Sequence, residues 1–409
     1  MSSDKKIILF EGEMIGGKGH HYHQLVENSF YYKDRGQIYW IVSKNFDSKD
    51  LYIPDFVNVK KCINSAKRNL NIKSSNNFFL TIKNILSNFF LIMYLLLKLN
   101  KINFEILFNL LNISKYFSSF YLNFDNKFFD ENDVIIFQTS RIDDFELGHF
   151  LSKLNYKCKM HFRIMQLNRK KRLKKFINII NDLYSSKKLF KDIFVYTENY
   201  FQKEKIKDLT NLDFEIFYNN LTFSEKNYGK NIFCVGFVGE SRIDKGFDKI
   251  PKIVEQLNLD TSIKKNFFIQ ISNCPKNLNY VKNEIYYLKK KFNNIKIVEG
   301  YINYFEYKKL LENIDIMPIL HTPEQLKFNG SGLVFSAITN EIPLVIPKYA
   351  NYVHKILTNK SFKEAENINE YVLGIKFIIK NYDSYLLKSK AESMEFKNKL
   401  LKDPLNNRI

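Results

Sequence analysis

Cysteine is scarce in this sequence, with four among 409 residues and no two of them in C-x-x-C spacing. They are Cys62, Cys158, Cys234 and Cys274. Cysteines in that spacing are the usual sign of a zinc site, and an even set in a short chain is the sign of a disulfide framework. We therefore expect neither, and the scattered thiols fit a reducing cytoplasm.

No apolar run is long enough to span a bilayer, which takes roughly 20 residues. The best candidate, residues 85–99, is continuously apolar only over 89–97, so an interfacial or buried helix is predicted there. The N-terminus also lacks a signal peptide, because residues 7–10 form only a short apolar run before Glu11 and Glu13. We expect a cytoplasmic protein that is not exported by that route.

Acidic residues are outnumbered, since 43 Asp and Glu stand against 63 Lys and Arg and the net charge is +20. Such a balance favours phosphates, nucleic acid or an anionic membrane surface without choosing among them. An AT-rich genome is an alternative explanation, because Lys, Asn, Ile, Phe and Tyr are all abundant. No nucleic-acid recognition motif accompanies the charge, so a nucleic-acid partner is not expected.

What the sequence does contain is an alternation of short apolar runs and helical stretches. Residues 7–10 are predicted to form a strand, followed by a Gly-rich loop at 11–21, a helix within 20–36 and a strand at 38–43. Further strands are predicted at 133–140, 159–165, 192–198, 232–239, 267–273, 295–302, 314–320 and 342–348. Strands that alternate with helices build parallel sheets, so the predicted fold class is α/β.

The chain is long enough for two or three domains of about 100–200 residues each. Residues 217–231, rich in Asn, Ser, Gly and Lys, have the composition of a linker. We expect a Rossmann-like domain over 1–220 with a helical insertion at about 76–124 and a second Rossmann-like domain over 221–380. A helical tail at 381–409 is expected to pack back on the first domain. Two such domains in tandem leave a cleft for a ligand.

One loop combines cations with glycine at a strand-to-helix junction. In "GFVGESRIDKGFDKI", residues 236–250, Arg242 and Lys245 stand beside Gly239 and Gly246, with a helix expected from about Phe247. Ligands of α/β folds usually bind where strands end and helices begin. The loop therefore predicts an anionic ligand.

Extended to "VGFVGESRIDKGFDKIPKIVEQL", this stretch resembles the signature of retaining GT-B glycosyltransferases of the family-four (group 1) type. Four further stretches agree with that family in order and spacing, and the resemblance covers most of the chain outside residues 50–130. They are "GGKGHHYHQLVENSFYYKDRG", "YNNLTFSEK", "IKIVEGYINYFEYKKLLENIDIMPIL" and "NGSGLVFSAITNEIPLVIP". The resemblance implies two Rossmann-like domains facing across a cleft and a nucleotide-diphosphate sugar as the donor.

The donor's diphosphate gains negative charge as the sugar bond breaks, and cations beside it stabilise that charge. Arg242 can grip phosphate oxygens bidentately, whereas Lys245 can act as a point charge. Backbone N–H groups at the start of a helix can meet the same diphosphate. The candidate diphosphate-binding residues are Arg242, Lys245, Gly17, Gly330, Ser331 and Gly332, and the nucleoside-binding candidates are Gly300, Tyr301 and Ser336.

The sequence departs from the family's pair of glutamates, which stand eight positions apart. Ser336 holds the second place and Phe328 the first, so Glu324 is the nearest carboxylate for a contact to the transferred sugar. Glu341 also stands where a glycine is common. These departures leave the identity of the donor open.

Histidines supply the remaining candidates. His161 lies near the end of a first-domain strand, where the resemblance implies a catalytic role, and Arg163 beside it is placed on the acceptor side of the cleft together with His20. The cluster at His20, His21 and His23 has no accompanying Asp or Cys ligands in register, so no metal is expected. No cofactor is expected either.

"NRKKRLKK", residues 168–175, places six cations in the first domain, the half that binds acceptors in the family. Together with the apolar stretch at 89–97, it favours a peripheral enzyme at the inner face of the cell membrane that handles a lipid-linked acceptor. A solvated helix face is the alternative explanation.

The sequence thus predicts a metal-independent hexosyltransferase of bacterial polysaccharide, lipopolysaccharide or glycolipid synthesis. A nucleotide-sugar 2-epimerase, which shares this architecture, and an inactive GT-B subunit that scaffolds a partner are the alternatives. Ser336 and Glu341 are the features that favour the inactive subunit.

Overall fold

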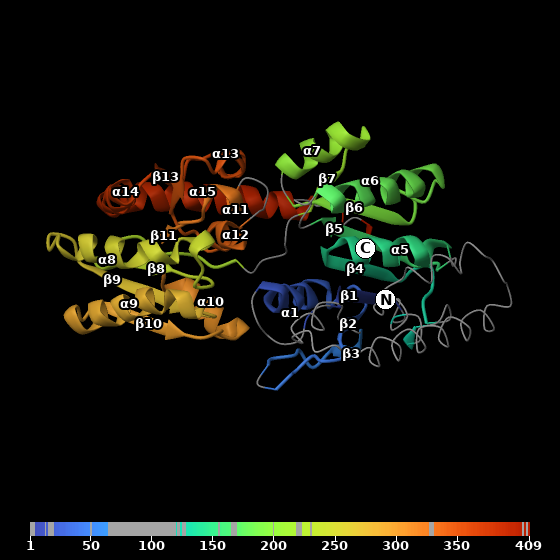
Figure 1. Ribbon diagram of the computed structural model, residues 1–409, viewed down its shortest axis with the longest axis horizontal. Helices are drawn as coiled ribbons and strands as arrows, with labels where there is room; N and C mark the ends of the chain where they lie inside the picture. The colour runs from blue at the N-terminus through green and yellow to red at the C-terminus, as the bar shows by residue number, and fades with distance from the viewer. Residues whose placement is uncertain are drawn as a thin grey trace, which may run out of the picture. The chain divides into compact units, whose positions relative to one another are not determined.

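We describe a computed structural model of the chain (Figure 1). The described residues are 5–12, 14, 20–49, 51–63, 120, 123–124, 128–153, 156–164, 170–198, 200–217, 223–229, 231–326, 331–402, 405 and 408–409. The side chains of residues 20, 153, 170–172, 324–325 and 351–352 are not described. The helical insertion predicted at 76–124, with its apolar stretch, therefore lies outside the described residues except for Phe120, Asn123 and Phe124.

The first sheet has seven strands in the order β3-β2-β1-β4-β5-β6-β7. The strands are β1 (Lys6–Glu11), β2 (Gln37–Ser43), β3 (Val57–Ile63), β4 (Val134–Ser140), β5 (Lys159–Ile164), β6 (Ile193–Thr197) and β7 (Glu215–Ile216). β1 pairs with β2 and with β4 in parallel, and every residue of β4 is buried. A strand buried on both faces has a continuous apolar sequence, which is why the central strands were predictable.

Helices α1 (His20–Tyr32), α5 (Ile142–Lys153), α6 (Lys170–Ser185) and α7 (Tyr200–Thr210) connect these strands. Gly148 of α5 lies so close to β5 that an added Cβ would stand 2.2 Å from the ring of Phe162. The Phe162 ring in turn stacks on Phe137 of β4, with 4.3 Å between the ring centroids. Aromatic stacking therefore joins this helix to the centre of the sheet.

The second half of the chain holds two parallel sheets, β10-β9-β8 and β11-β12-β13. Their strands are β8 (Phe233–Phe237), β9 (Lys265–Ile271), β10 (Ile295–Glu299), β11 (Met317–Pro318), β12 (Leu344–Pro347) and β13 (Phe362–Ala365). A parallel bridge between Val235 and Ile316 joins β8 to the start of β11. The combined order is β10-β9-β8-β11-β12-β13, which is the Rossmann order and reverses direction between β8 and β11.

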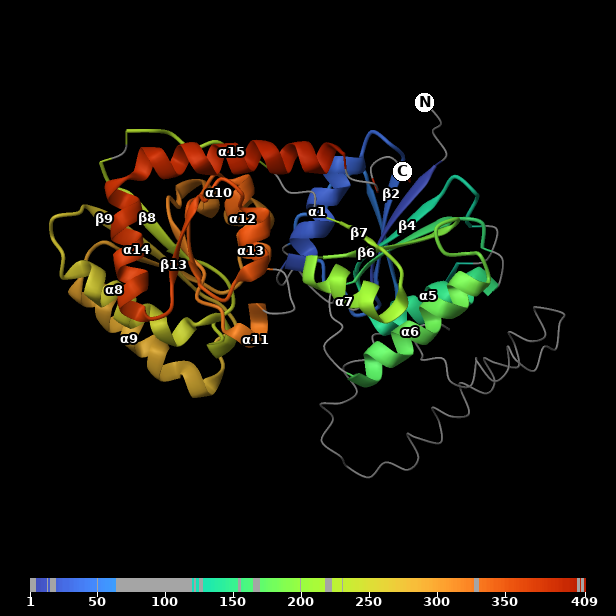
Figure 2. The same ribbon diagram turned by 90° about the horizontal axis from the view of Figure 1, so that it is seen from above.

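Helices cover both faces of this second sheet (Figure 2). They are α8 (Ile250–Asn258), α9 (Asn279–Lys291), α10 (Tyr304–Asn313), α11 (Pro323–Leu326), α12 (Gly332–Thr339), α13 (Asn351–Ile356), α14 (Ile368–Lys380) and α15 (Tyr382–Leu401). Buried residues of α8, α9 and α14 form one apolar core with the strands, and those of α10, α12 and α13 belong to another. α8 shows the reason, because Ile250, Ile253, Val254 and Leu257 repeat at helical spacing and are all buried.

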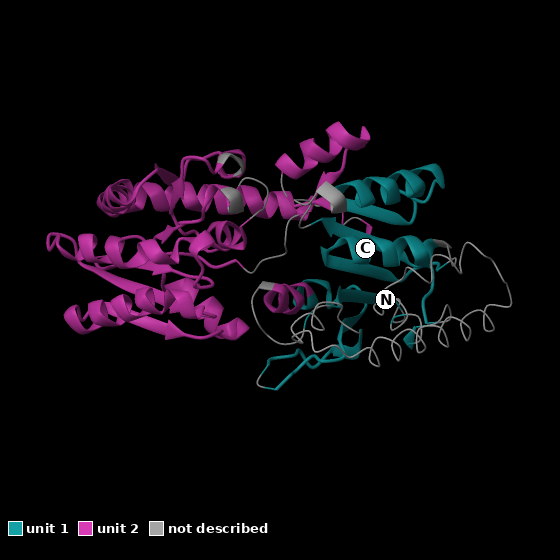
Figure 3. Cartoon of the chain, viewed as in Figure 1, with its two compact units in different colours: residues 1–17, 29–164, 169–195 teal, residues 18–28, 165–168, 196–409 magenta. Residues whose placement is uncertain are grey.

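The chain divides into two compact units (Figure 3). Unit 1 comprises residues 1–17, 29–164 and 169–195, and unit 2 comprises residues 18–28, 165–168 and 196–409. The domain boundaries expected from the sequence, and the packing of the tail at 381–409 on the first domain, stay predictions. Among the described residues, none of the helices combines the length and the apolar character needed to cross a membrane.

Candidate functional site

The loop after β8 lies where the strand order of the second sheet reverses. Gly246 in this loop has φ 72°, and an added Cβ would stand 2.3 Å from the Leu320 carbonyl oxygen, so glycine is required on both counts. The Thr322 N–H donates to the Asp244 carbonyl at 2.9 Å. The loop is thus held against the segment that follows β11, which is the place where open α/β sheets bind ligands.

Polar contacts to β9 fix the first part of the same loop. Gly239, with φ 122°, donates its N–H to Gln270 Oε1 at 3.0 Å, and its carbonyl accepts from the Ser272 hydroxyl at 3.0 Å. The Ser241 N–H donates to the Ser272 carbonyl at 2.9 Å. A loop with its backbone bonded to a neighbouring strand presents its side chains in fixed positions.

Two short 3-10 turns follow, η2 (Ile243–Lys245) and η3 (Phe247–Lys249), and α8 begins only at Ile250. The helix predicted from about Phe247 therefore starts later than expected. The left-handed Gly246 separates the two turns, and such a residue interrupts helical hydrogen bonding.

The two predicted cations lie in this loop, and both are paired with carboxylates. Arg242 Nε donates to Asp244 Oδ1 at 2.8 Å, and Arg242 Nη2 pairs with Asp244 Oδ2. Arg242 Nη1 donates to Glu240 Oε2 at 3.0 Å, and the same oxygen lies 3.9 Å from Lys245 Nζ. Arg242 and Lys245 therefore form, with Glu240 and Asp244, a cluster of two cations and two anions in a single loop.

The pKa values of the cluster show how its members depend on one another. Burial alone would raise the pKa of Glu240, but Lys245 and the hydrogen bonds from Arg242 and Tyr301 lower it below the ordinary value. Burial lowers the pKa of Lys245, and the Glu240 carboxylate opposes that shift. The Asp244 carboxylate raises the pKa of Arg242. Burial would also raise the pKa of Asp244, but its contacts to Arg242 lower it below the ordinary value. Both carboxyl groups are consequently ionised at neutral pH, together with the guanidinium.

Glu240 also contacts the segment that follows β10. The Tyr301 hydroxyl donates to Glu240 Oε1 at 3.1 Å, and burial with this neighbouring carboxylate raises the pKa of Tyr301 to about 12. Gly300, with φ 77°, accepts a hydrogen bond at its carbonyl from Gln270 Nε2 at 3.2 Å. The structure thus brings the predicted residues Tyr301, Arg242 and Lys245 together around one carboxylate that the sequence analysis did not single out.

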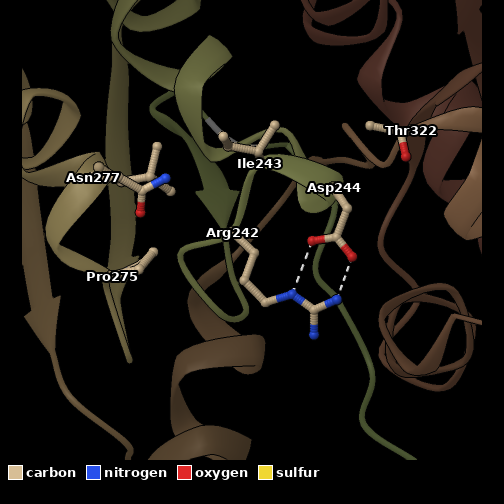
Figure 4. A pocket seen from close by; sticks show the side chains of 7 residues that line it. Arg242, Ile243, Asp244, Pro275, Asn277 and Thr322 are labelled. Atoms are coloured by element: carbon tan, nitrogen blue, oxygen red, sulfur yellow. Dashed lines mark hydrogen bonds and ion pairs between the residues drawn. The ribbon is translucent and has the colours of Figure 1, made fainter.

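A pocket of 550 Å³ opens beside the cluster. Its lining residues come from the loops after β8, β9 and β11, and they are Arg242, Ile243, Asp244, Pro275, Asn277, Leu278 and Thr322. Arg242 lies in this lining with its guanidinium joined to Asp244 (Figure 4). The pocket is the size of many small-molecule sites, which measure about 300–1,000 Å³.

The start of α12 lies near the same loop. An added Cβ at Gly239 would stand 3.6 Å from the Leu333 side chain, and open space surrounds the corresponding position at Gly332. Ser331 is the N-cap, and its buried hydroxyl has no hydrogen-bond partner among the described residues. The N-terminus of a helix attracts anions, so Ser331 and Gly332 are suitably placed for one. Gly330 lies outside the described residues.

Ser336 and Glu341, the two departures from the family pattern, both have partners in the structure. The Tyr307 hydroxyl donates to Ser336 Oγ at 3.2 Å. Glu341 has φ 53°, in the left-handed region that explains why glycine is common there, and its carboxylate accepts from the Lys226 N–H at 2.8 Å. Both residues therefore make hydrogen bonds within the fold.

His321 is a buried member of this region that the sequence analysis missed. Its side chain follows β11, and burial together with Lys245 and Arg242 lowers its pKa to about 3, so the imidazole is neutral. Nδ1 has no hydrogen-bond partner among the described residues. A single histidine between Leu320 and Thr322 gives no periodic or motif signal, so only the strand order could have revealed it.

Of the candidates from the first half of the chain, His161 and Arg163 belong to unit 1 and His20 belongs to unit 2. His161 is the third residue of β5, is 1% exposed and stacks on Phe194 with 4.7 Å between ring centroids. Arg163, on the same strand, is 2% exposed. Their roles stay predictions, as does that of Gly17, which lies outside the described residues. His20 is the first residue of α1 and Glu324 lies in α11, but the side chains of both are not described.

Comparisons with solved structures identify the architecture, whereas no protein-family model and no curated protein matches the sequence. Sucrose-phosphate synthase from Thermosynechococcus elongatus is 10% identical over 96% of this chain and 94% of its own, with a TM-score of 0.57. TarM is 13% identical over 100% and 99%, with a TM-score of 0.61. HepE from Anabaena, in complex with UDP and glucose, is 12% identical over 95% and 94%, with a TM-score of 0.56.

These likenesses extend over almost the whole length of both chains in each comparison, and sequence identity is low in all three. The parallel sheets with Rossmann strand order agree with them. The chain therefore has the GT-B fold, an α/β architecture of two Rossmann-like domains.

Proposed function

We propose that this protein is a retaining glycosyltransferase that takes its sugar from a nucleotide-diphosphate donor. The observation that carries the proposal is the position of Arg242 and Lys245, in the loop where the strand order reverses and near the start of α12. HepE, which shares the fold, was solved with UDP and glucose, and this supports a donor of the same class.

The chemistry assigned to the loop is stabilisation of the leaving group. The bond between the anomeric carbon and the β-phosphate oxygen breaks, and its electron pair leaves with the diphosphate. Arg242 uses three of its five N–H groups in the contacts to Asp244 and Glu240, which leaves two for phosphate oxygens. Lys245 and the N-terminus of α12 add positive charge at the same place.

No side-chain nucleophile is required in this scheme. The acceptor hydroxyl oxygen attacks the anomeric carbon from the face that the diphosphate leaves, and its proton passes to a departing phosphate oxygen. The configuration at the anomeric carbon is then retained. We assign nucleoside contacts to Gly300, Tyr301 and Ser336 and further diphosphate contacts to Gly17 and to residues 330–332. Glu324 and His161 are assigned to the transferred sugar, and His20 and Arg163 to the acceptor.

Thermal-shift measurements against UDP-, GDP-, ADP- and CMP-linked sugars test this function. A ligand that binds only the folded state at 100 times its dissociation constant adds about 2.7 kcal/mol of stability, so one of the donors should raise the melting temperature clearly. Product analysis then separates the alternatives. Glycoside formed only when an acceptor is present supports the transferase, an epimerised sugar without acceptor supports a 2-epimerase, and no shift with any donor supports an inactive subunit.

We expect sugar transfer to survive treatment with EDTA. Among the described residues, no group of three His, Cys, Asp or Glu side chains is placed to hold a metal ion. Arg242 and Lys245 supply the positive charge that Mg²⁺ or Mn²⁺ would otherwise bring to a diphosphate. The transfer rate after chelation, with and without added Mg²⁺, is the measurement. A strict requirement for the added metal would contradict the assignment of a metal-independent site.

The acceptor that we propose is a glycan or lipid-linked glycan at the inner face of the cell membrane. Neutralising the cations at the start of α6, Lys170, Lys171, Arg172, Lys174 and Lys175, is expected to weaken binding to acidic liposomes. High salt should do the same, because the Debye length falls to about 3 Å at 1 M. The measurement is co-sedimentation with liposomes at low and high salt.

A control variant neutralises the exposed Lys289, Lys290 and Lys291 of α9, and it should bind liposomes as the unaltered protein does. Activity on a soluble acceptor should hardly change in either variant. If the unaltered protein ignores acidic liposomes at low salt, the membrane assignment fails.

A further inference from the structure

Glu240 contacts three of the side chains that we assign to the proposed donor site. One carboxylate oxygen, Oε2, accepts from Arg242 Nη1 at 3.0 Å and lies 3.9 Å from Lys245 Nζ. The other, Oε1, accepts from the Tyr301 hydroxyl at 3.1 Å. A single carboxylate thus contacts both cations of the loop after β8 and a residue that follows β10. Its side chain is 29% exposed, so these contacts are partly shielded from water.

We propose that Glu240 is a positioning residue of the donor site. It aligns Arg242 and Lys245 for the diphosphate, and it links their alignment to Tyr301, before the donor arrives. This inference rests on the proposed function, because it assigns the two cations to the donor's phosphates. Charged groups held in place in advance need no reorganisation when negative charge develops on the leaving group.

Asp244 cannot fill the same role. Its carboxylate contacts Arg242, and its carbonyl accepts from the Thr322 N–H, whereas the contact that the structure describes for the Tyr301 hydroxyl is to Glu240. The ion pair of Asp244 is with Arg242, whereas Glu240 Oε2 lies 3.9 Å from Lys245 Nζ and 3.0 Å from Arg242 Nη1. Among the described residues, Glu240 alone contacts all three of the side chains that the donor would meet.

The arrangement has a consequence for the protonation of Lys245. Burial lowers its pKa, Arg242 lowers it further, and Glu240 and Asp244 act in the opposite direction. His321, the other titratable group near it, is neutral because burial lowers its own pKa to about 3. Removing the negative charge of Glu240 therefore lowers the pKa of Lys245 further, and Lys245 loses its proton at a lower pH.

Glu240→Gln is the variant that tests the proposal, because it keeps the shape of the side chain and removes its charge. Two ions about 4 Å apart in a partly shielded site interact strongly enough to move a pKa by about one unit. Binding of UDP, GDP or ADP should weaken at alkaline pH as Lys245 loses its proton. In Glu240→Gln, we expect the midpoint of this loss to lie about one pH unit lower than in the unaltered protein. Asp248→Asn is the matched control, because it removes the same charge from an exposed side chain of the same segment. This variant should keep the pH dependence of the unaltered protein.

A second measurement needs no nucleotide. The rate at which Lys245 is acetylated as a function of pH, followed by mass spectrometry, reports its protonation directly and should show the same downward shift in Glu240→Gln. Tyr301→Phe keeps the carboxylate and removes one contact, so it should slow sugar transfer and leave the pH of half-acetylation unchanged. This variant also covers the case in which Glu240→Gln fails to fold.

The outcomes separate the two levels of inference. If acetylation and nucleotide binding keep their pH dependence in Glu240→Gln, or if Tyr301→Phe transfers sugar at the unaltered rate, Glu240 is not a positioning residue and the proposed function stands. If the unaltered protein binds none of the three nucleotides at any pH, the proposed function fails, and the role of Glu240 in a donor site is overturned with it.

Discussion

Replacing either Arg242 or Lys245 by alanine is expected to lower the rate of sugar transfer by about 100-fold to 1,000-fold, the usual effect of removing one group that stabilises developing charge. The loss should lie in kcat, because the negative charge on the leaving diphosphate grows towards the transition state. Steady-state kinetics with the donor found by thermal shift provide the measurement. Near-normal kinetics in both variants would remove the donor site from this loop.

The fold should survive both changes. The side chains of Arg242, Asp244 and Glu240 are 42%, 36% and 29% exposed, so water can solvate the carboxylates that lose their partner. Partly exposed ion pairs contribute about 0–1 kcal/mol to stability, which predicts melting temperatures close to that of the unaltered protein. Lys249→Ala is the control, because Lys249 is a cation of the same segment for which the structure shows no ion pair among the described residues.

A double variant distinguishes electrostatics from simple damage to the loop. Arg242→Ala leaves Asp244 without its bidentate partner, so an uncompensated carboxylate faces the donor's phosphates. Adding Asp244→Asn removes that repulsion. The double variant should therefore transfer sugar faster than Arg242→Ala alone, whereas a loop that has merely collapsed would become slower with each change.

The sequence carried clear signals for the parts of this site that lie within one loop. Arg242, Lys245 and their glycines stand together in the chain, and the left-handed φ of Gly246 explains why glycine occupies that position. Glu240 was missed because its importance lies in a contact to Tyr301, which is 61 residues away. That contact arises because β9 places the loops after β8 and β10 near each other, and no local pattern records it.

Among the strands, too, some could be predicted from the sequence and others could not, and the missed strands lie at sheet edges. Every central strand of the first sheet was predicted, because a strand covered on both faces has a continuous apolar sequence. β3, β7 and β13 were missed, and each lies at an edge of its sheet, whereas the edge strand β10 was predicted at 295–302. β3 exposes Lys60 and Lys61, and β13 exposes Glu364. Charges at a sheet edge discourage pairing with other chains, but they also erase the apolar pattern by which a strand is recognised.

Asp133→Ala is expected to cause a large loss of stability in unit 1. The carboxylate is fully buried and stands directly before β4. Its Oδ1 accepts from the Lys6 N–H at 2.7 Å, and its Oδ2 accepts from the Asp130 N–H at 3.0 Å and from Lys6 Nζ at 3.1 Å. It therefore joins the beginnings of β1 and β4, the two strands at the centre of the sheet.

Alanine at this position would leave two backbone N–H groups without an acceptor and the Lys6 ammonium without its counterion. Breaking a buried ion pair from one side costs about 3–5 kcal/mol, and the 22% exposure of Lys6 places this case at the lower end. Urea unfolding followed with hydrogen exchange of the β1 and β4 amides measures the effect. Asp133→Asn keeps one acceptor oxygen, so its free energy of unfolding should lie between those of Asp133→Ala and the unaltered protein.

Asp130→Ala is the matched control, because its carboxylate is exposed and accepts only from the Asn132 N–H among the described contacts. That variant should lose no more than about 1 kcal/mol, since the contact is local and open to water. If Asp133→Ala unfolds at the same urea concentration as Asp130→Ala, the buried carboxylate does not hold the two strands together. Protection of the β1 amides against exchange would then have to come from the apolar packing of Ile7, Ile8 and Leu9 alone.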